Sequence, residues 1–180
     1  MATNALLPTL TIRQPWAALI ASKAKRFETR SWAPPARLIG TRLAIHAGRS
    51  AIPRDLASDD VSAIEVALGR PVFEWSSLPF GAIVCVATLV GACEVAEWHP
   101  GADIVGVRRT VAGSPPLAEI TLRPGEWRYG DYRPGRWLWM LGDVEVLDVP
   151  VPATGQQGVW RWAGSFSAVR RATQSRCPSK

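Results

Sequence analysis

The chain has little sulfur and little imidazole. Its three cysteines, Cys85, Cys93 and Cys177, form no C-x-x-C pair, and only His46 and His99 carry imidazole. An odd number of widely spaced thiols argues against a disulfide framework, and the scarcity of Cys and His argues against a zinc site. We therefore expect no metal and no cofactor, and we expect Cys85 and Cys93 to be small buried apolar residues.

Long apolar runs are also missing. The longest, around residues 82–90, is too short to cross a bilayer, and the start of the chain lacks a charged segment followed by an apolar one. We expect no membrane attachment and a cytoplasmic location. Of the 180 residues, 47% are hydrophobic and 20% are charged, which favours one folded domain with a real core over disorder.

Acidic residues are almost absent from the N-terminal third. Residues 1–54 hold nine Lys or Arg against one acid, Glu28, whereas residues 55–162 hold eight Arg against fourteen acids. This division predicts a positive face that attracts phosphates, although a solvated surface is the simpler interpretation. Residues 163–180 add four basic side chains and no acidic one. We expect one domain over 1–162 and a flexible basic tail over 163–180 that binds nucleic acid weakly.

Hydrophobic periodicity predicts many short strands and two helices. The expected strands are 10–13, 26–32, 40–47, 81–95 (with a bulge at Gly91), 135–149 (one long strand or a pair) and 155–162, and the expected helices are 15–22 and 53–68. Residues 101–130 are expected to form an insertion or long loop with a short strand or two. Together these elements predict an α+β fold, a mixed β-barrel with flanking helices.

Charged residues of both signs stand close together after the first predicted helix. Lys25, Glu28 and Arg30 follow one another in the spacing K-x-x-E-x-R. Because side chains alternate along a strand, Glu28, Arg30 and Trp32 are predicted to share one face. A salt-bridged surface patch is one interpretation. The other is a cleft in which the cations hold a single carboxylate and bind an anionic or polar ligand.

Five blocks, in order, resemble one known family. Residues 10–32, LTIRQPWAALIASKAKRFETRSW, are similar to the opening of ASCH domains, with an apolar strand, Q-P-W-A, an apolar helix and then G-x-K-x-x-E-x-R. Lys23 stands where that pattern has Gly, which would allow a left-handed turn. The other blocks are 40–48 (ending I-H-A-G), 79–84, 130–139 (G-D-x-x-P-G-R-x-x-W) and 155–160 (G-x-Q-G-x-W).

The ASCH resemblance implies a PUA-like β-barrel whose cleft holds the K-x-x-E-x-R residues and binds RNA or a modified nucleoside or nucleotide. Some similar members hydrolyse N4-acetylcytidine, and others have been ascribed ribonuclease activity. If this chain were such an amidohydrolase, Lys25 and Glu28 would be catalytic. Those members carry a hydroxyl residue where this chain has Glu28. A ribonuclease would have to rely on His46 with Lys25.

The candidate ligand-binding residues gather at several places in the sequence. Arg13 and Gln14 stand at a strand-to-helix junction, where Gln14 alternatively caps the helix, and Trp16 is expected in the core. Trp32 is the preferred stacking ring, and Trp137 and Trp139 are expected to be structural. The candidates are Arg13, Gln14, Lys23, Lys25, Glu28, Arg30, Trp32, His46 (cleft rim or core), and, through the resemblance, Arg136, Gln157 and Trp160.

Overall fold

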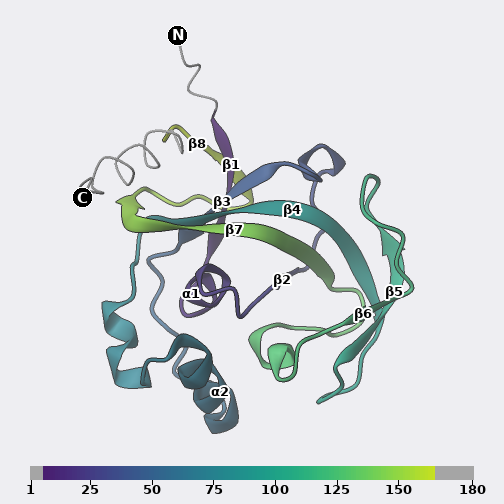
Figure 1. The fold of residues 1–180 in the computed structure, drawn as a ribbon, viewed down its shortest axis with the longest axis horizontal. Coiled ribbons are helices and arrows are strands. Elements are labelled where there is room, and N and C mark those ends of the chain that lie inside the picture. Colours follow the sequence, from purple (N-terminus) through teal and green to yellow (C-terminus); the bar gives the residue numbers. More distant parts are fainter. Residues whose placement is uncertain (1–5, 165–180) are drawn as a thin grey trace, which may run out of the picture.

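The computed structural model describes residues 6–164, which form one large mixed sheet with few helices (Figure 1). The strands are β1 (Leu7–Ile12), β2 (Phe27–Arg30), β3 (Arg42–Ala47), β4 (Ala82–Glu97), β5 (Ile104–Thr110), β6 (Glu119–Thr121), β7 (Trp137–Pro152) and β8 (Val159–Trp162). The helices are α1 (Trp16–Ala21) and α2 (Ser58–Leu68), with 3-10 turns η1 (Ala36–Leu38), η2 (Val72–Ser77) and η3 (Glu126–Tyr129).

The sheet follows the order β2-β7-β4-β3-β1-β8, with β5 and β6 attached to β4. Strands β1 and β3 pair in parallel, with Thr11 opposite His46, and the other pairs are antiparallel. The long strands β4 and β7 run side by side and bend across the molecule (Figure 1). Their register shifts next to Gly91, the position where the sequence predicted a bulge.

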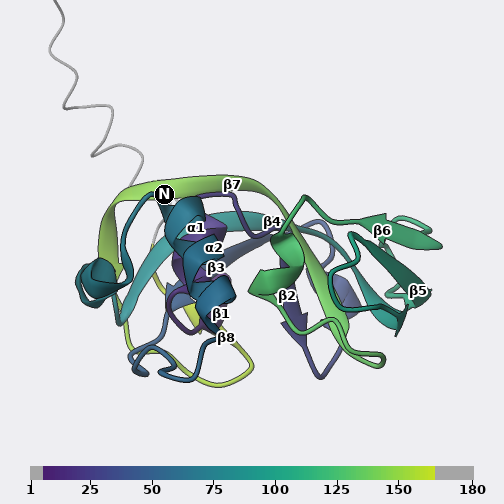
Figure 2. The ribbon, with the colours of Figure 1, turned by 90° about the horizontal axis from the view of Figure 1, so that it is seen from below.

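Helix α1 lies between the sheet and α2. It contacts β3, β4 and β7 on one side and α2 on the other, and its buried residues are Ala17, Leu19 and Ile20. This arrangement follows from the spacing of apolar residues along the short helix. Figure 2 shows both helices over the middle of the sheet, whereas β5 and β6 project at one end.

The elements confirm the predicted α+β class and most of the predicted segments. The strand predicted over 26–32 ends at Arg30, because Arg30 pairs with Trp137, where the partner strand β7 begins. The helix predicted from residue 53 begins at Ser58, with Asp59 and Asp60 in its first turn, and it ends at the left-handed Gly69. Residues 101–130 contain two short strands, as expected.

The predicted closed barrel is not confirmed. Within residues 6–164 the strand path ends at β2 and β8, and these two strands are not paired, so the sheet stays open. The core confirms the other structural expectations: Cys85, Cys93, Trp137 and Trp139 are all buried. None of the described helices is long and apolar enough to cross a membrane. The tail over 165–180 lies outside the described residues.

Candidate nucleic-acid site

The K-x-x-E-x-R residues meet around one carboxylate. Lys25 Nζ lies 3.6 Å from Glu28 Oε2, and Arg30 Nε lies 3.0 Å from Glu28 Oε1. Lys25 is buried, with 1% of its surface exposed, and Glu28 is 8% exposed. Burial lowers the pKa of Lys25 below its usual value, while the Glu28 charge opposes this shift. The three side chains therefore form one ion-paired cluster.

The short turn before β2 holds Lys25 in place. Lys23 occupies the family's glycine position and has a φ of 66°, so the left-handed corner is kept without glycine. The backbone N–H of Lys25 donates to the carbonyl oxygen of Leu19 at 3.0 Å, which closes the end of α1. This corner directs the Lys25 amine inward, whereas the Lys23 side chain is exposed.

A second segment, residues 126–131, packs against this cluster. Lys25 Nζ donates to the carbonyl oxygen of Tyr129 at 2.5 Å, and the Glu126 carboxylate accepts from the Arg26 side chain at 2.7 Å. At Gly130 an added Cβ would lie 2.9 Å from the methyl carbon of Thr29, so glycine allows this close approach. The cluster is therefore shared between residues about a hundred positions apart in the chain.

A cavity of about 330 Å³ opens beside Lys25 and Glu28. We call it cavity A. Its polar lining residues are Lys25, Glu28, Thr29, Asp60, Arg128 and Asp131, and its apolar and aromatic ones are Ile12, Trp16, Leu56 and Tyr129, with Gly130 between them. Formally, two cations face three carboxylates. The formal net charge of the lining is therefore negative, which disfavours binding of a phosphate in cavity A.

Arginines outside cavity A hold Asp131, which lines it. The guanidinium of Arg133 binds both oxygens of Asp131 and holds the pKa of that carboxyl below its usual range. Arg136 Nε lies 3.3 Å from Asp131 Oδ2, and Arg136 Nη2 donates to the carbonyl oxygen of Thr29 at 3.3 Å. Arg136, a candidate only through the family resemblance, thus braces two residues that line the cavity.

His46, Gln157 and Trp160 gather at a different cavity, of about 320 Å³, which we call cavity B. His46 and Gln157 line it, and the Trp160 ring contacts His46 edge-on at 5.7 Å between centroids. Trp160 donates its indole N–H to Thr11 Oγ1 at 3.0 Å. Cavities A and B border consecutive residues of β1, Ile12 and Thr11.

The His46 ring is buried, and its surroundings favour the uncharged imidazole. Its Nε2 lies 3.1 Å from the carbonyl oxygen of Ala153, which only accepts, so Nε2 carries the proton. Burial lowers the pKa of His46. Its Nδ1 has no hydrogen-bond partner within the described part of the chain. The ring is therefore on the rim of cavity B and not beside Lys25.

Seven sequence candidates line neither cavity: Arg13, Gln14, Lys23, Arg30, Trp32, Arg136 and Trp160. Gln14 is fully buried: its amide donates to the carbonyl oxygen of Pro79 at 2.8 Å and accepts from the Ala18 N–H at 3.0 Å. Its side-chain oxygen thus accepts from an N–H of the first turn of α1, which supports the capping alternative. Trp32 stands edge-on to Trp139 at 4.8 Å. Arg13 is exposed and donates to the carbonyl oxygen of Ala51 at 2.7 Å.

Sequence reasoning missed several residues of cavity A. Trp16 was expected only in the core. It is partly buried, packs against the core and also lines cavity A. Asp131 stood in a recognised motif block without being given a role. Asp60 was interpreted only as a helix-start acid, and Arg128, which pairs with it at 2.9 Å, carried no sequence signal. Within residues 6–164, no group of three or more His, Cys, Asp or Glu side chains is arranged to hold a metal ion.

The comparison with family models covers three of the five motif blocks, 10–32, 40–48 and 79–84. The family model described as "ASCH domain" matches residues 10–110, more than half of the chain. A comparison with curated protein sequences gave no match. The matched region runs from β1 to β5 and contains Lys25, Glu28, Arg30 and His46. The chain therefore belongs to the ASCH domain family, a PUA-like family of RNA-binding domains.

Proposed function

We propose that this protein binds RNA, or a single nucleoside unit of it, by taking one nucleobase into cavity A. The observation that carries the proposal is the pair of carboxylates, Glu28 and Asp131, lining a cavity beside the half-buried ring of Trp16. Carboxylates accept hydrogen bonds from exocyclic amino groups of bases. An indole ring offers a stacking surface to any base.

Size and charge support a base rather than a phosphate as the occupant. The cavity volume of about 330 Å³ lies near the lower end of the range for small-molecule sites. Lys25 and Arg30 are already paired with Glu28, so neither offers a free cation to a phosphate. The phosphates of a bound RNA therefore lie outside cavity A.

The test compares four nucleosides. Cytidine, adenosine and guanosine carry an exocyclic amino group, whereas uridine does not. We expect the first three to raise the melting temperature of the protein and to bind more tightly than uridine in calorimetric titration. Asp131→Asn should weaken cytidine binding about tenfold, because a hydrogen bond to a charged acceptor becomes one to a neutral acceptor.

Asp131→Asn is preferred to Glu28→Gln as the first variant. Removing the Glu28 charge leaves the buried Lys25 amine without its partner and destabilises the fold. Glu119→Gln, at an exposed position that lines neither cavity, is the control and should bind cytidine as the wild type does. Equal binding of uridine and cytidine, or unchanged binding by Asp131→Asn, contradicts the proposal.

A second candidate is hydrolysis of an acylated cytidine, and the buried amine of Lys25 favours it. In this reaction water adds to the acyl carbon, the C–N bond breaks, and cytidine and a carboxylic acid are released. Lys25 lines cavity A with a lowered pKa and could act as a base or nucleophile, with Glu28 orienting the water. No comparable observation favours the ribonuclease alternative, because His46 and Lys25 line different cavities.

A further inference from the structure

The loop between β3 and α2, residues 48–57, borders three cavities in succession. The largest, of about 650 Å³, is here called cavity C. Arg49 lines both cavity B and cavity C, and Leu56 lines both cavity C and cavity A. Arg13 fixes the middle of the loop through the carbonyl oxygen of Ala51. The three cavities are therefore neighbours along one loop, with cavity A at one end.

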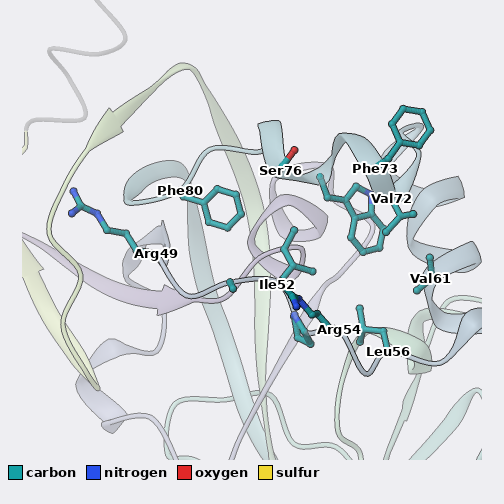
Figure 3. A pocket seen from close by; sticks show the side chains of 12 residues that line it. Arg49, Ile52, Arg54, Leu56, Val61, Val72, Phe73, Ser76 and Phe80 are labelled. Carbon is teal, nitrogen blue, oxygen red and sulfur yellow. The ribbon is translucent and has the colours of Figure 1, made fainter.

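Cavity C has an aromatic wall that is partly open to solvent. Phe73, on η2, is 78% exposed, whereas Trp75 on the same turn is buried. Figure 3 shows Phe73 and Phe80 at well-separated ends of the cavity, with Ile52 and Arg54 between them. An exposed ring such as Phe73, next to the exposed Val72 at the edge of an apolar hollow, indicates a surface for binding a ligand.

The charged residues around cavity C indicate the charge of the ligand that it binds. Arg49 and Arg54 are exposed, and neither forms an ion pair within the described part of the chain. The lining includes no acidic side chain. An anionic occupant is therefore complementary. The chain's own residues 163–180 are not, because they carry four basic and no acidic side chains.

We propose that cavity C is a second base-binding subsite, and that loop 48–57 carries the phosphates of a single-stranded RNA leading into cavity A. This inference rests on the proposed function. Arg49 and Arg54 bind the backbone, and one or two bases stack on Phe80 and Phe73. Separated aromatic rings interleaved with arginines match single-stranded RNA, in which planar bases alternate with charged phosphates. An acidic peptide has the charge but lacks that regular alternation.

The experiment measures binding of cytidine and of a nine-nucleotide single-stranded RNA by Arg54→Ala and Phe73→Ala. Both side chains are exposed, so both variants should fold. We expect each variant to lose about tenfold in affinity for the RNA and to bind cytidine in cavity A as the wild type does, since neither side chain lines cavity A. A 4-thiouridine RNA irradiated on the wild type should crosslink to the peptide containing Phe73 or Phe80.

Matched controls separate a local effect from a general one. Arg37→Ala removes another exposed arginine, and Val66→Ala removes another exposed apolar side chain, and neither residue lines any of the three cavities. Both should bind the RNA as the wild type does. If Arg37→Ala weakens RNA binding as much as Arg54→Ala, the effect is one of total charge and the proposed path is wrong.

The remaining outcomes distinguish this inference from the proposed function. Unchanged RNA binding by Arg54→Ala and Phe73→Ala, with wild-type affinity for cytidine intact, overturns the path along loop 48–57 and leaves cavity A in place. Absence of both cytidine and RNA binding by the wild type overturns the proposed function itself. The choice of RNA is overturned in favour of a protein partner if a nine-residue acidic peptide binds the wild type more tightly than the RNA does. The affinity for that peptide would also have to fall in Arg54→Ala and Phe73→Ala.

Discussion

At the scale of single residues, Lys25 has the most unusual surroundings. Its amine is almost completely buried, donates to the carbonyl oxygen of Tyr129 and faces the Glu28 carboxylate. Burial favours the neutral amine and the carboxylate favours the charged one, and burial is the larger effect. The same side chain therefore serves as a structural link between two segments and as a candidate base at the wall of cavity A.

Hydrolysis of N4-acetylcytidine, if it occurs, should depend on the neutral form of Lys25. The lowered pKa means that this form accumulates at a lower pH than it does for a lysine with the ordinary value of 10.5. We expect the rate of cytidine release to rise with pH, with its midpoint below pH 10.5, measured by chromatography of the product. Lys25→Met should abolish release. Turnover that persists in a folded Lys25→Met protein, or no turnover by the wild type, excludes this chemistry.

At the scale of elements, the corner between α1 and β2 decides where the motif side chains point. Lys23 there has the left-handed backbone that glycine adopts freely and other L-residues adopt at a cost. The carbonyl oxygen of Lys23 accepts from Arg123 Nη1 at 2.9 Å, which ties the corner to the segment after β6. The corner geometry is thus retained by tertiary contacts where the family pattern has a glycine.

Lys23→Gly should stabilise the protein. Glycine relieves the strain of the left-handed backbone, but it also raises the backbone entropy of the unfolded chain, which offsets part of the gain. The net increase in the free energy of unfolding should be about 0.5–1 kcal/mol. Urea denaturation at pH 7 measures it. The neighbouring Ser22→Gly is the matched control: Ser22 has a φ of −73° and donates to Leu19, so glycine should destabilise there. A loss of stability in Lys23→Gly would disprove the argument.

At the scale of the whole molecule, folding redistributes the charge that the sequence concentrates near its start. Of the nine basic residues in the first 54, four form ion pairs, with partners Glu28, Glu126 and Glu145. Two of those acids come from the far end of the described chain. The exposed arginines left around loop 48–57 are Arg13, Arg49 and Arg54. The positive face is therefore much smaller than the sequence count indicates.

This redistribution predicts a shallow salt dependence of RNA binding. Three phosphate contacts should give a slope of about −2 in a plot of log K against log salt concentration, whereas nine contacts would give about −6. Anisotropy titrations of a labelled single-stranded RNA between low and moderate salt measure this slope. A slope near −6 would show that further cations contact phosphates, either those of the ion pairs, such as Lys25 and Arg30, or those of residues 163–180.

Local pattern was enough to predict most elements. The apolar spacing in 15–22 predicted α1, and the alternation in 10–13 predicted the end of β1, because amphipathic helices and half-buried strands each have a characteristic spacing of apolar residues. The motif K-x-x-E-x-R likewise marked three residues that do meet. Local pattern could not place Trp32, because the end of β2 depends on where β7 begins.

Residue order and short-range periodicity were enough to identify the family, the α+β class and the segment that carries the central carboxylate. Which charges remain unpaired, and which residues complete cavity A, became known only from the folded chain. Those properties depend on contacts such as Lys25 with Tyr129 and Arg26 with Glu126, between residues about a hundred positions apart. The energy of an ion pair depends on distance and burial in space, which residue order alone does not specify.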